Sequence, residues 1–358
     1  MRSLTRNLPK DISNANLLFF IATIIFIVMY GLAIIFYPGS FRQLQTFFDL
    51  FSLNAPLIIV TLAMSIVMIG GGIDISVGAV TGLVTMCCAV LLEVKMKSVG
   101  SAVILALGIG IAFGLLQGYL IAYLDIQPFI ITLAGMFLAN GLLTTIHKDP
   151  LNVTAKAFVS LRDVEVVIPW LGSYNARGIF IPLGIKPGAI VAVVLIVLLF
   201  ILMKWTRFGR NLYAVGGNSQ SALMLGINVR KTKFYSYLLS GLLSGIAGFV
   251  YLMTTGAGNV GNAAGFEMKA IAASIIGGTM LTGGVGNILG SPVGALTFLT
   301  INELIRAAGV HSNYQAIVSG FLLYVFIVLQ SVIVWVRTRG QFKLVLPSWL
   351  PSISKGHG

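Results

Sequence analysis

The chain has 358 residues, of which 57% are hydrophobic and only 9% are charged, and its mean hydropathy is +0.97. This composition excludes an ordinary soluble globular domain, in which about a quarter of the residues are charged. The net charge of +13 does not indicate nucleic-acid binding, because the basic residues mostly flank apolar segments and form no recognisable binding module.

Apolar runs that can cross a membrane follow one another along the chain. A spanning helix needs about 20 mainly apolar residues to cross a hydrocarbon core of about 30 Å. Ten runs are predicted as spans, at residues 17–37, 53–69, 77–92, 102–123, 129–146, 189–203, 235–253, 268–281, 288–305 and 316–336. The shortest, 268–281, is also consistent with a helix that crosses only half the membrane. We therefore expect an all-α polytopic membrane protein with about ten transmembrane helices, or eight if the first half contains a misassigned crossing.

The distribution of lysine and arginine predicts the orientation, because positively charged flanks stay on the cytoplasmic side. Basic residues concentrate at the amino end, in residues 205–234 and at the start of the tail. If there are ten spans, these three places lie on the same side of the membrane, so both termini are predicted to be cytoplasmic. Lys95 and Lys97 disagree, since they would face outward. Residues 147–187 become an outer loop of a single domain that covers 1–358.

The first glycine-rich interruption is "IGGGIDISVG", residues 69–78. A helix satisfies its own backbone polar groups in lipid, whereas such an interruption must be buried in protein or line an aqueous cavity. One interpretation is that the Asp74 carboxylate accepts backbone N–H groups where the next helix starts. The alternative is that it lies on a substrate path at membrane depth. The candidate path residues in this stretch are Gly71, Gly72, Asp74, Ser76 and Gly78.

The second interruption, residues 276–294, contains Gly283 and Gly284 and lacks the Lys-Ser/Thr ending of a phosphate-binding loop. We expect close helix packing through small residues together with a kink. After it, "SPVGALTFLT" resembles "SVGAVTGLVT", which follows the first interruption. Such internal repeats are common in transporters, and chance similarity in a low-complexity apolar chain is the alternative.

Few other polar groups are expected at membrane depth. Gln117, Asn140, Glu267, Lys269 and Glu303 stand out. No span carries the series of ionisable residues that an ion-coupled carrier usually needs. Each of these five residues is explained most simply by packing or by a position at the membrane interface, and Asn140 is retained as a candidate path residue. The adjacent Cys87 and Cys88 indicate neither a disulfide framework nor a metal site.

A short helix is predicted inside the basic segment 205–234. Asn218 would cap it, residues 219–225 would form about two turns, and Gly226 would end it. A helix this short is marginal in water and must pack against something. It is either a connector on the membrane surface or a docking element for a cytoplasmic partner. The candidate docking residues are Asn218, Ser219, Ser221, Ala222, Leu225 and Gly226.

Taken in order, "GGIDISVGA", "PFIITLAGMF", "TRFGRNLYAVGGNSQSALMLGI" and "GGTMLTGGVGNILG" resemble the sugar-type permeases of bacterial ABC importers, such as ribose and galactofuranose permeases. The ordered set covers most of the chain and is specific, whereas any single glycine motif is not. "IDIS" stands where that family often has "IDLS". The resemblance implies no cofactor and no covalent chemistry, since the chain would move a sugar by alternating access.

The resemblance also implies a location in a bacterial inner membrane, and three partners: a separate ATPase subunit, a second permease copy or paralogue, and an external sugar-binding protein. In that family the short inner helix fits a groove on the ATPase, which corresponds here to residues 218–226. Three alternatives stay open, namely a branched-chain amino acid permease of the broader family, an ion-coupled secondary sugar carrier, and a passive channel or structural subunit.

Overall fold

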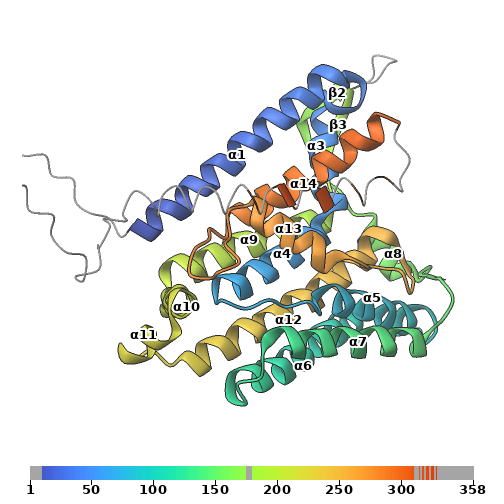
Figure 1. Ribbon diagram of the computed structural model, residues 1–358. Helices are drawn as coiled ribbons and strands as arrows, with labels where there is room; N and C mark the ends of the chain where they lie inside the picture. The colour runs from blue at the N-terminus through green and yellow to red at the C-terminus, as the bar shows by residue number, and fades with distance from the viewer. Residues whose placement is uncertain are drawn as a thin grey trace, which may run out of the picture.

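The computed structural model describes residues 10–174 and 180–309, together with positions 314, 317, 320, 321, 324, 325 and 328. Long helices lie side by side in a bundle. The short helices α10 (Arg207–Gly217) and α11 (Ser219–Met224) lie at one end, which we call the α11 end (Figure 1). The hairpin of β2 (Val166–Tyr174) and β3 (Phe180–Ile185) lies at the opposite end, which we call the hairpin end.

The remaining helices account for most of the described chain. The longer ones are α1 (Lys10–Phe36), α4 (Ala55–Ile69), α5 (Val77–Glu93), α6 (Val99–Tyr123), α7 (Pro128–Ile146), α9 (Pro187–Trp205), α12 (Val229–Thr255) and α14 (Gly290–Ala307). The shorter ones are α2 (Pro38–Phe41), α3 (Leu44–Leu53), α8 (Lys156–Arg162) and α13 (Phe266–Ile276). Proline at the first turn of α4, α7 and α9 suits a helix start, because its missing N–H would have no intrahelical partner there.

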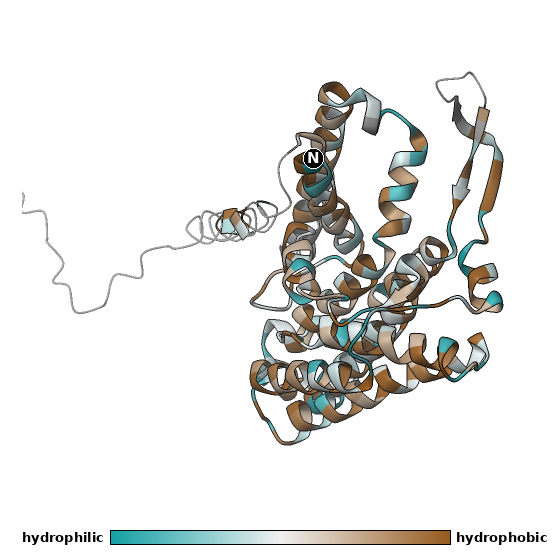
Figure 2. Ribbon diagram, turned by 90° about the vertical axis from the view of Figure 1, so that its right-hand side faces the viewer, coloured by the Kyte–Doolittle hydropathy of each residue, from teal (hydrophilic) through white to brown (hydrophobic). Residues whose placement is uncertain are grey.

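The described chain is mostly helical, as expected, and it also contains short strands that were not expected. β1 (Leu151–Asn152) pairs antiparallel with β4 (Ala257–Gly258), and β2 pairs antiparallel with β3. The β2–β3 hairpin stands beyond the helices (Figure 2) and is held to α3 by Gln45, whose amide nitrogen donates to the Gly184 carbonyl at 3.2 Å. These strands occur where the chain leaves the apolar bundle, so their backbone groups need partners that a spanning helix would otherwise supply.

The span count of about ten is not confirmed. Among the described residues, α1, α6, α7, α9 and α12 are long and apolar enough to cross a membrane, and α3 with α4, bent by 59°, makes a sixth candidate. α5 has 17 residues and α13 only 11, so α13 is shorter than the predicted 268–281 run. The predicted run 316–336 falls, apart from isolated positions, outside the described residues.

The direction of the chain nevertheless alternates through the first half of the bundle. Gly188 adjoins both Ala55, at the start of α4, and Val250, near the end of α12. Just past the other end of α4, Gly72 adjoins Tyr237, near the start of α12. α4 is therefore antiparallel to α12.

α5 returns along the same helix in the opposite sense. The Thr81 hydroxyl donates to the Ser244 carbonyl at 3.3 Å, and the Thr85 hydroxyl donates to the Gly248 carbonyl at 2.9 Å. From the first bond to the second, the residue number rises by four on both helices, so α5 is parallel to α12. The chain thus reverses between α4 and α5, as separate crossings require.

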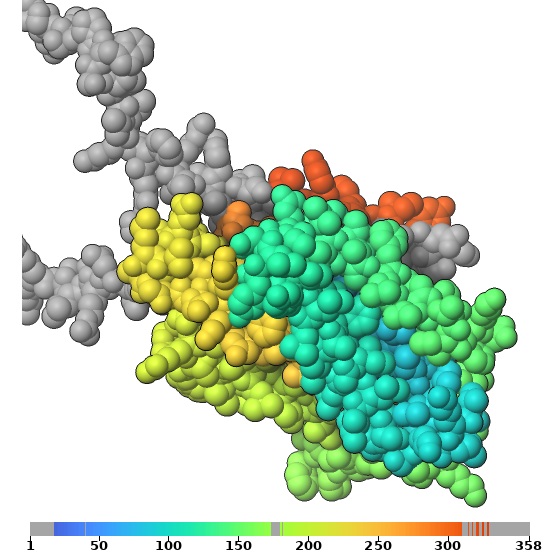
Figure 3. Space-filling model, turned by 90° about the horizontal axis from the view of Figure 1, so that it is seen from below, coloured from blue at the N-terminus to red at the C-terminus, as the bar shows by residue number. Residues whose placement is uncertain are grey.

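Hydrophobic residues run along most of the helices (Figure 2), and many large ones are exposed on the outside of the bundle. Large exposed hydrophobic side chains include Phe20 and Ile27 on α1, Phe137 on α7 and Val197 on α9. α6 and α7 cover much of the face seen in Figure 3, where the α11 region projects at one edge. Exposed apolar belts of this kind fit helices surrounded by lipid rather than by water.

Glycines bring α6 and α12 into backbone contact. An added Cβ at Gly110 would collide with the Gly241 carbonyl, and one at Gly118 would lie 2.9 Å from the Phe234 carbonyl oxygen. α6 is therefore antiparallel to α12. In lipid, helices gain little from hydrophobicity itself, so close approach through small residues is a main source of their association.

We expect Gly110→Leu to destabilise the protein strongly, because a side chain there must push α12 away from α6. Overpacking of this kind costs about 1–3 kcal/mol or more. The matched control is Gly108→Leu on the same helix, since a Cβ at Gly108 has nothing within 4 Å. Thermal unfolding of detergent-solubilised protein should show a clearly lower midpoint for Gly110→Leu only. Equal midpoints for the two variants would contradict this packing account.

Candidate functional site

The first break, residues 70–76, joins α4 to α5 and is held by a buried polar network. The Asp74 carboxylate accepts the Ser76 backbone N–H at 3.1 Å, the Ser76 hydroxyl at 2.7 Å and the Ser240 hydroxyl of α12 at 2.6 Å. Gln117 of α6 donates to the Ser76 hydroxyl oxygen at 2.9 Å. Asp74 thus accepts the N–H at the start of α5. It is only 1% exposed, so its carboxylate is enclosed by protein in this conformation.

The glycines of this stretch allow the break to fit among its neighbours. Gly71 has φ = +81°, a conformation that favours glycine. A Cβ at Gly72 would collide with the Tyr237 hydroxyl, and one at Gly78 would collide with the Glu267 carboxylate. Gly72 and Gly78 therefore pack against α12 and α13 rather than lining open space.

The second break, residues 277–289, joins α13 to α14. A Cβ at Gly277 would collide with the Gly290 carbonyl, and one at Gly294 would collide with the Ala273 carbonyl. The residue nearer the end of α13 contacts the start of α14, and the earlier residue contacts a later one, so α13 and α14 are antiparallel. The expected close packing is confirmed, whereas the expected kink is wrong. The chain reverses direction completely within the break. The glycines then allow the backbones of α13 and α14 to lie in direct contact.

The two breaks meet each other at the α11 end. The Gly284 backbone N–H donates to the Ile69 carbonyl at 2.9 Å, and a Cβ at Gly283 would lie 2.7 Å from the Gly71 Cα. Gly283 and Gly284 have φ of +82° and +72°. Gly216, near the end of α10, lies against both breaks, because a Cβ there would collide with the Ile69 carbonyl and approach the Gly284 nitrogen at 2.6 Å. We call this meeting of Gly71, Gly216, Gly283 and Gly284 the glycine junction.

The structure does not bring Asn140 to this junction. Asn140 lies within α7, which runs without interruption from Pro128 to Ile146, and it is exposed. Its position in a continuous helix separates Asn140 from both breaks, and its place on a translocation path stays a prediction.

The short helix predicted inside the basic segment is confirmed as α11. Asn218 caps it, since its side-chain oxygen accepts the Ser221 backbone N–H at 2.8 Å. Gly226 follows its last turn with φ = +78°, as a glycine terminator does. Sequence analysis missed the preceding helix α10, whose buried Leu212 and Val215 are three residues apart and could have indicated it.

The exposed face of α11 differs in part from the predicted docking residues. Ala222 is only 2% exposed, so it cannot be a direct contact for a partner and instead holds α11 against the bundle. Leu225 is 79% exposed, as a docking residue must be. Sequence analysis missed Leu223 and Met224, which are 64% and 87% exposed. The signal available was three consecutive large apolar residues in a segment that is otherwise polar and basic.

The helices before and after α11 carry basic residues. Arg207 and Arg210 lie on α10, and Arg230, Lys231 and Lys233 lie in the first turns of α12. The Arg230 guanidinium lies 3.6 Å from the Asp125 carboxylate, and both side chains are largely exposed. An exposed apolar tip between two basic helix segments suits a partner with an apolar groove and acidic surroundings.

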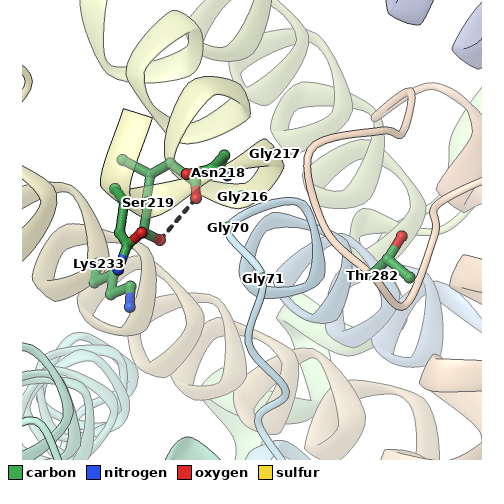
Figure 4. A pocket seen from close by; sticks show the side chains of 10 residues that line it. Gly70, Gly71, Gly216, Gly217, Asn218, Ser219, Lys233 and Thr282 are labelled. Carbon is green, nitrogen blue, oxygen red and sulfur yellow. Dashed lines mark hydrogen bonds between the residues drawn. The ribbon is translucent and has the colours of Figure 1, made fainter. Parts of the chain in front are cut away.

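A cavity of about 330 Å³ opens beside the glycine junction (Figure 4). Its lining consists of Gly70, Gly71, Val215, Gly216, Gly217, Asn218, Ser219, Gln220, Lys233 and Thr282. The Ser219 hydroxyl donates to the Val215 carbonyl at 2.9 Å across the α10–α11 boundary. The cavity thus lies between the start of α11 and the two breaks.

No set of metal ligands was found. Within the described part of the chain, no group of three or more His, Cys, Asp or Glu side chains could hold a metal ion. Cys87 and Cys88 are free thiols on α5.

Comparison with known proteins places these features in a family. Residues 46–327 match the family described as branched-chain amino acid transport system / permease component. The fructose import permease protein FruG of Bifidobacterium longum is 35% identical over 87% of this chain and 90% of its own length. The inner membrane ABC transporter permease protein YjfF of Escherichia coli is 34% identical, covering 88% and 92%. The ribose import permease protein RbsC of Bacillus subtilis is 35% identical, covering 76% and 80%. No solved structure matches the chain.

Proposed function

The chain belongs to the family of branched-chain amino acid transport system permease components, and from this premise we propose that it is the membrane subunit of an ATP-driven importer of a monosaccharide. The observation that carries the proposal is the similarity, over most of the chain, to permeases that import fructose and ribose. The chain is a transport subunit rather than an enzyme, and the ATPase is a separate subunit.

In this proposal α11 is the contact with the ATPase. Its exposed apolar tip, Leu223, Met224 and Leu225, would enter a groove on that subunit, while the buried Ala222 anchors the helix to the permease. The neighbouring basic residues support a cytoplasmic position of the α11 end. The hairpin end then faces the outside, where a sugar-binding protein would deliver substrate. Both chain termini would be cytoplasmic.

The translocation step would be alternating access. ATPase closure moves α11, the helices that adjoin the two breaks change their packing, and sugar passes through the interface between two permease subunits. The sugar path needs hydrogen-bonding groups without strong charge. The second permease subunit is either another copy of this chain or a paralogue.

Reconstitution tests the proposed function directly. Proteoliposomes containing this chain with its ATPase and binding protein should take up radiolabelled fructose or ribose only when ATP is supplied to the ATPase side. Liposomes without the ATPase are the control. Uptake of leucine instead of either sugar would favour a branched-chain amino acid permease. Sugar uptake driven by an ion gradient, with no ATPase present, would overturn the importer proposal.

A further inference from the structure

We propose that Gly216 is a positioning residue that transmits movement of α11 to both glycine-rich breaks at once. This inference rests on the proposed function, because it concerns how work done by the ATPase reaches the permease helices. It adds a specific route, from α11 through the end of α10 to the glycine junction. The route is built from backbone contacts rather than from side chains.

The first step of the route is the connection between α11 and α10. Asn218 lies between the two helices, and its backbone N–H donates to the Ala214 carbonyl at 3.1 Å. Its side chain caps α11 at the Ser221 N–H, while the Ser219 hydroxyl returns to the Val215 carbonyl. Asn218 and Ser219 therefore donate two hydrogen bonds across the boundary to the last turn of α10. A displacement of α11 must carry the last turn of α10 with it.

The second step is the contact of α10 with the breaks. Gly216 lies two residues before Asn218 and touches the Ile69 carbonyl, at the end of α4, and the Gly284 nitrogen, in the second break. These same two groups are hydrogen-bonded to each other at 2.9 Å. Gly216 thus sits against the bond that joins the two breaks. No flexible side chain lies between these backbones, so movement there is passed on rather than absorbed by rotamer changes.

The helix that follows α11 is also hydrogen-bonded to the first break. The Ser240 hydroxyl of α12 donates to the Asp74 carboxylate at 2.6 Å, and α12 begins soon after α11 ends. α11 is therefore attached to the first break through α10 before it and through α12 after it. The cavity beside Gly216 and Gly217 leaves space into which the end of α10 can move.

The test compares two neighbouring glycines of α10. A Cβ at Gly216 would force the junction apart, whereas a Cβ at Gly217 has nothing within 4 Å. In the assembled transporter, Gly216→Ala should retain the ATPase subunit and basal ATP hydrolysis. It should lower sugar-stimulated hydrolysis and uptake about tenfold or more, because about 1.4 kcal/mol changes a rate tenfold. Gly217→Ala should match the wild type.

A measurement on the wild type keeps the test decisive if Gly216→Ala does not fold. Hydrogen exchange of the assembled transporter should show that trapping the ATP-bound state changes amide protection in residues 69–72 and 283–286 together. A change in only one break, or in neither, would overturn the proposed route. So would a folded Gly216→Ala transporter that takes up sugar as fast as Gly217→Ala. Both results would leave the importer function intact, whereas absence of ATP-dependent uptake by the wild type would refute that function itself.

Discussion

Leu225→Glu is expected to abolish association with the ATPase subunit while leaving insertion of the chain in the membrane unchanged. The Leu225 side chain is 79% exposed and follows the last turn of α11, so glutamate there strains nothing within the permease. In the docked state the same position would be enclosed by an apolar groove. Burying a leucine contributes about 1.5–3 kcal/mol, and a carboxylate in its place adds a desolvation cost.

The affinity of the permease for the ATPase should therefore fall at least about 100-fold, which corresponds to about 2.8 kcal/mol. The measurement is co-purification of the ATPase with a tagged permease, followed by ATP-dependent sugar uptake.

Matched variants separate the apolar contact from simple charge. Leu225→Met keeps an apolar side chain and should bind the ATPase normally. Gln220→Glu adds one negative charge to the same exposed helix without removing an apolar group, and it should weaken binding far less. Undiminished co-purification by Leu225→Glu would reject the docking role of α11.

Ala222 behaves differently in this account. Because its side chain is buried, Ala222→Glu should disrupt the seating of α11 itself, and so it cannot serve as a clean test of docking.

Asp74→Leu is expected to cause the largest loss of stability among substitutions in the first break. The leucine would remove the acceptor for the Ser76 N–H and the Ser240 hydroxyl in a fully buried site, and would leave the Ser76 hydroxyl only the Gln117 side-chain oxygen, at 3.2 Å. Each buried donor left without a partner costs about 1–3 kcal/mol. Thermal unfolding should shift strongly downward, and sugar uptake by the assembled transporter should fall to near background.

Asp74→Asn separates hydrogen bonding from charge. The asparagine oxygen can still accept the Ser76 N–H, so this variant should retain more stability and more uptake than Asp74→Leu. Asp149→Leu makes the leucine substitution at an exposed aspartate between α7 and β1 and should be nearly neutral. Equal uptake and equal unfolding midpoints for Asp74→Leu and Asp74→Asn would remove the structural role assigned to this carboxylate.

The two similar stretches, "SVGAVTGLVT" and "SPVGALTFLT", occupy similar places in the structure. α5 begins directly after the first break and α14 directly after the second. Gly78 and Gly294, which occupy the same place in the two stretches, each lie against a backbone carbonyl, of Ala263 and of Ala273. The correspondence is the one that an internal repeat would produce, since each stretch starts a helix at a close backbone contact.

Local features of the molecule could be predicted from the sequence alone. Apolar composition indicated a membrane protein, and long hydrophobic runs located α6, α7 and α9 within three residues at each end. The runs also located α1 and α12, although these helices begin seven and six residues earlier than predicted. Asn218 and Gly226 marked the start and end of α11, because a cap and a terminator act on backbone groups only a few residues away. Asp74 was placed correctly at the start of α5 for the same reason.

Only the tertiary structure decided which of these local features meet. Nothing in the sequence around Gly71, Gly216 or Gly284 indicates that they touch, since glycine permits close backbone approach without specifying the partner. The buried face of α11 likewise depends on what packs beneath it, which is why Ala222 turned inward while Leu223 and Met224 turned outward. Residue chemistry determined the helices and their ends, whereas contacts between segments far apart in the chain were determined by how the helices pack against one another.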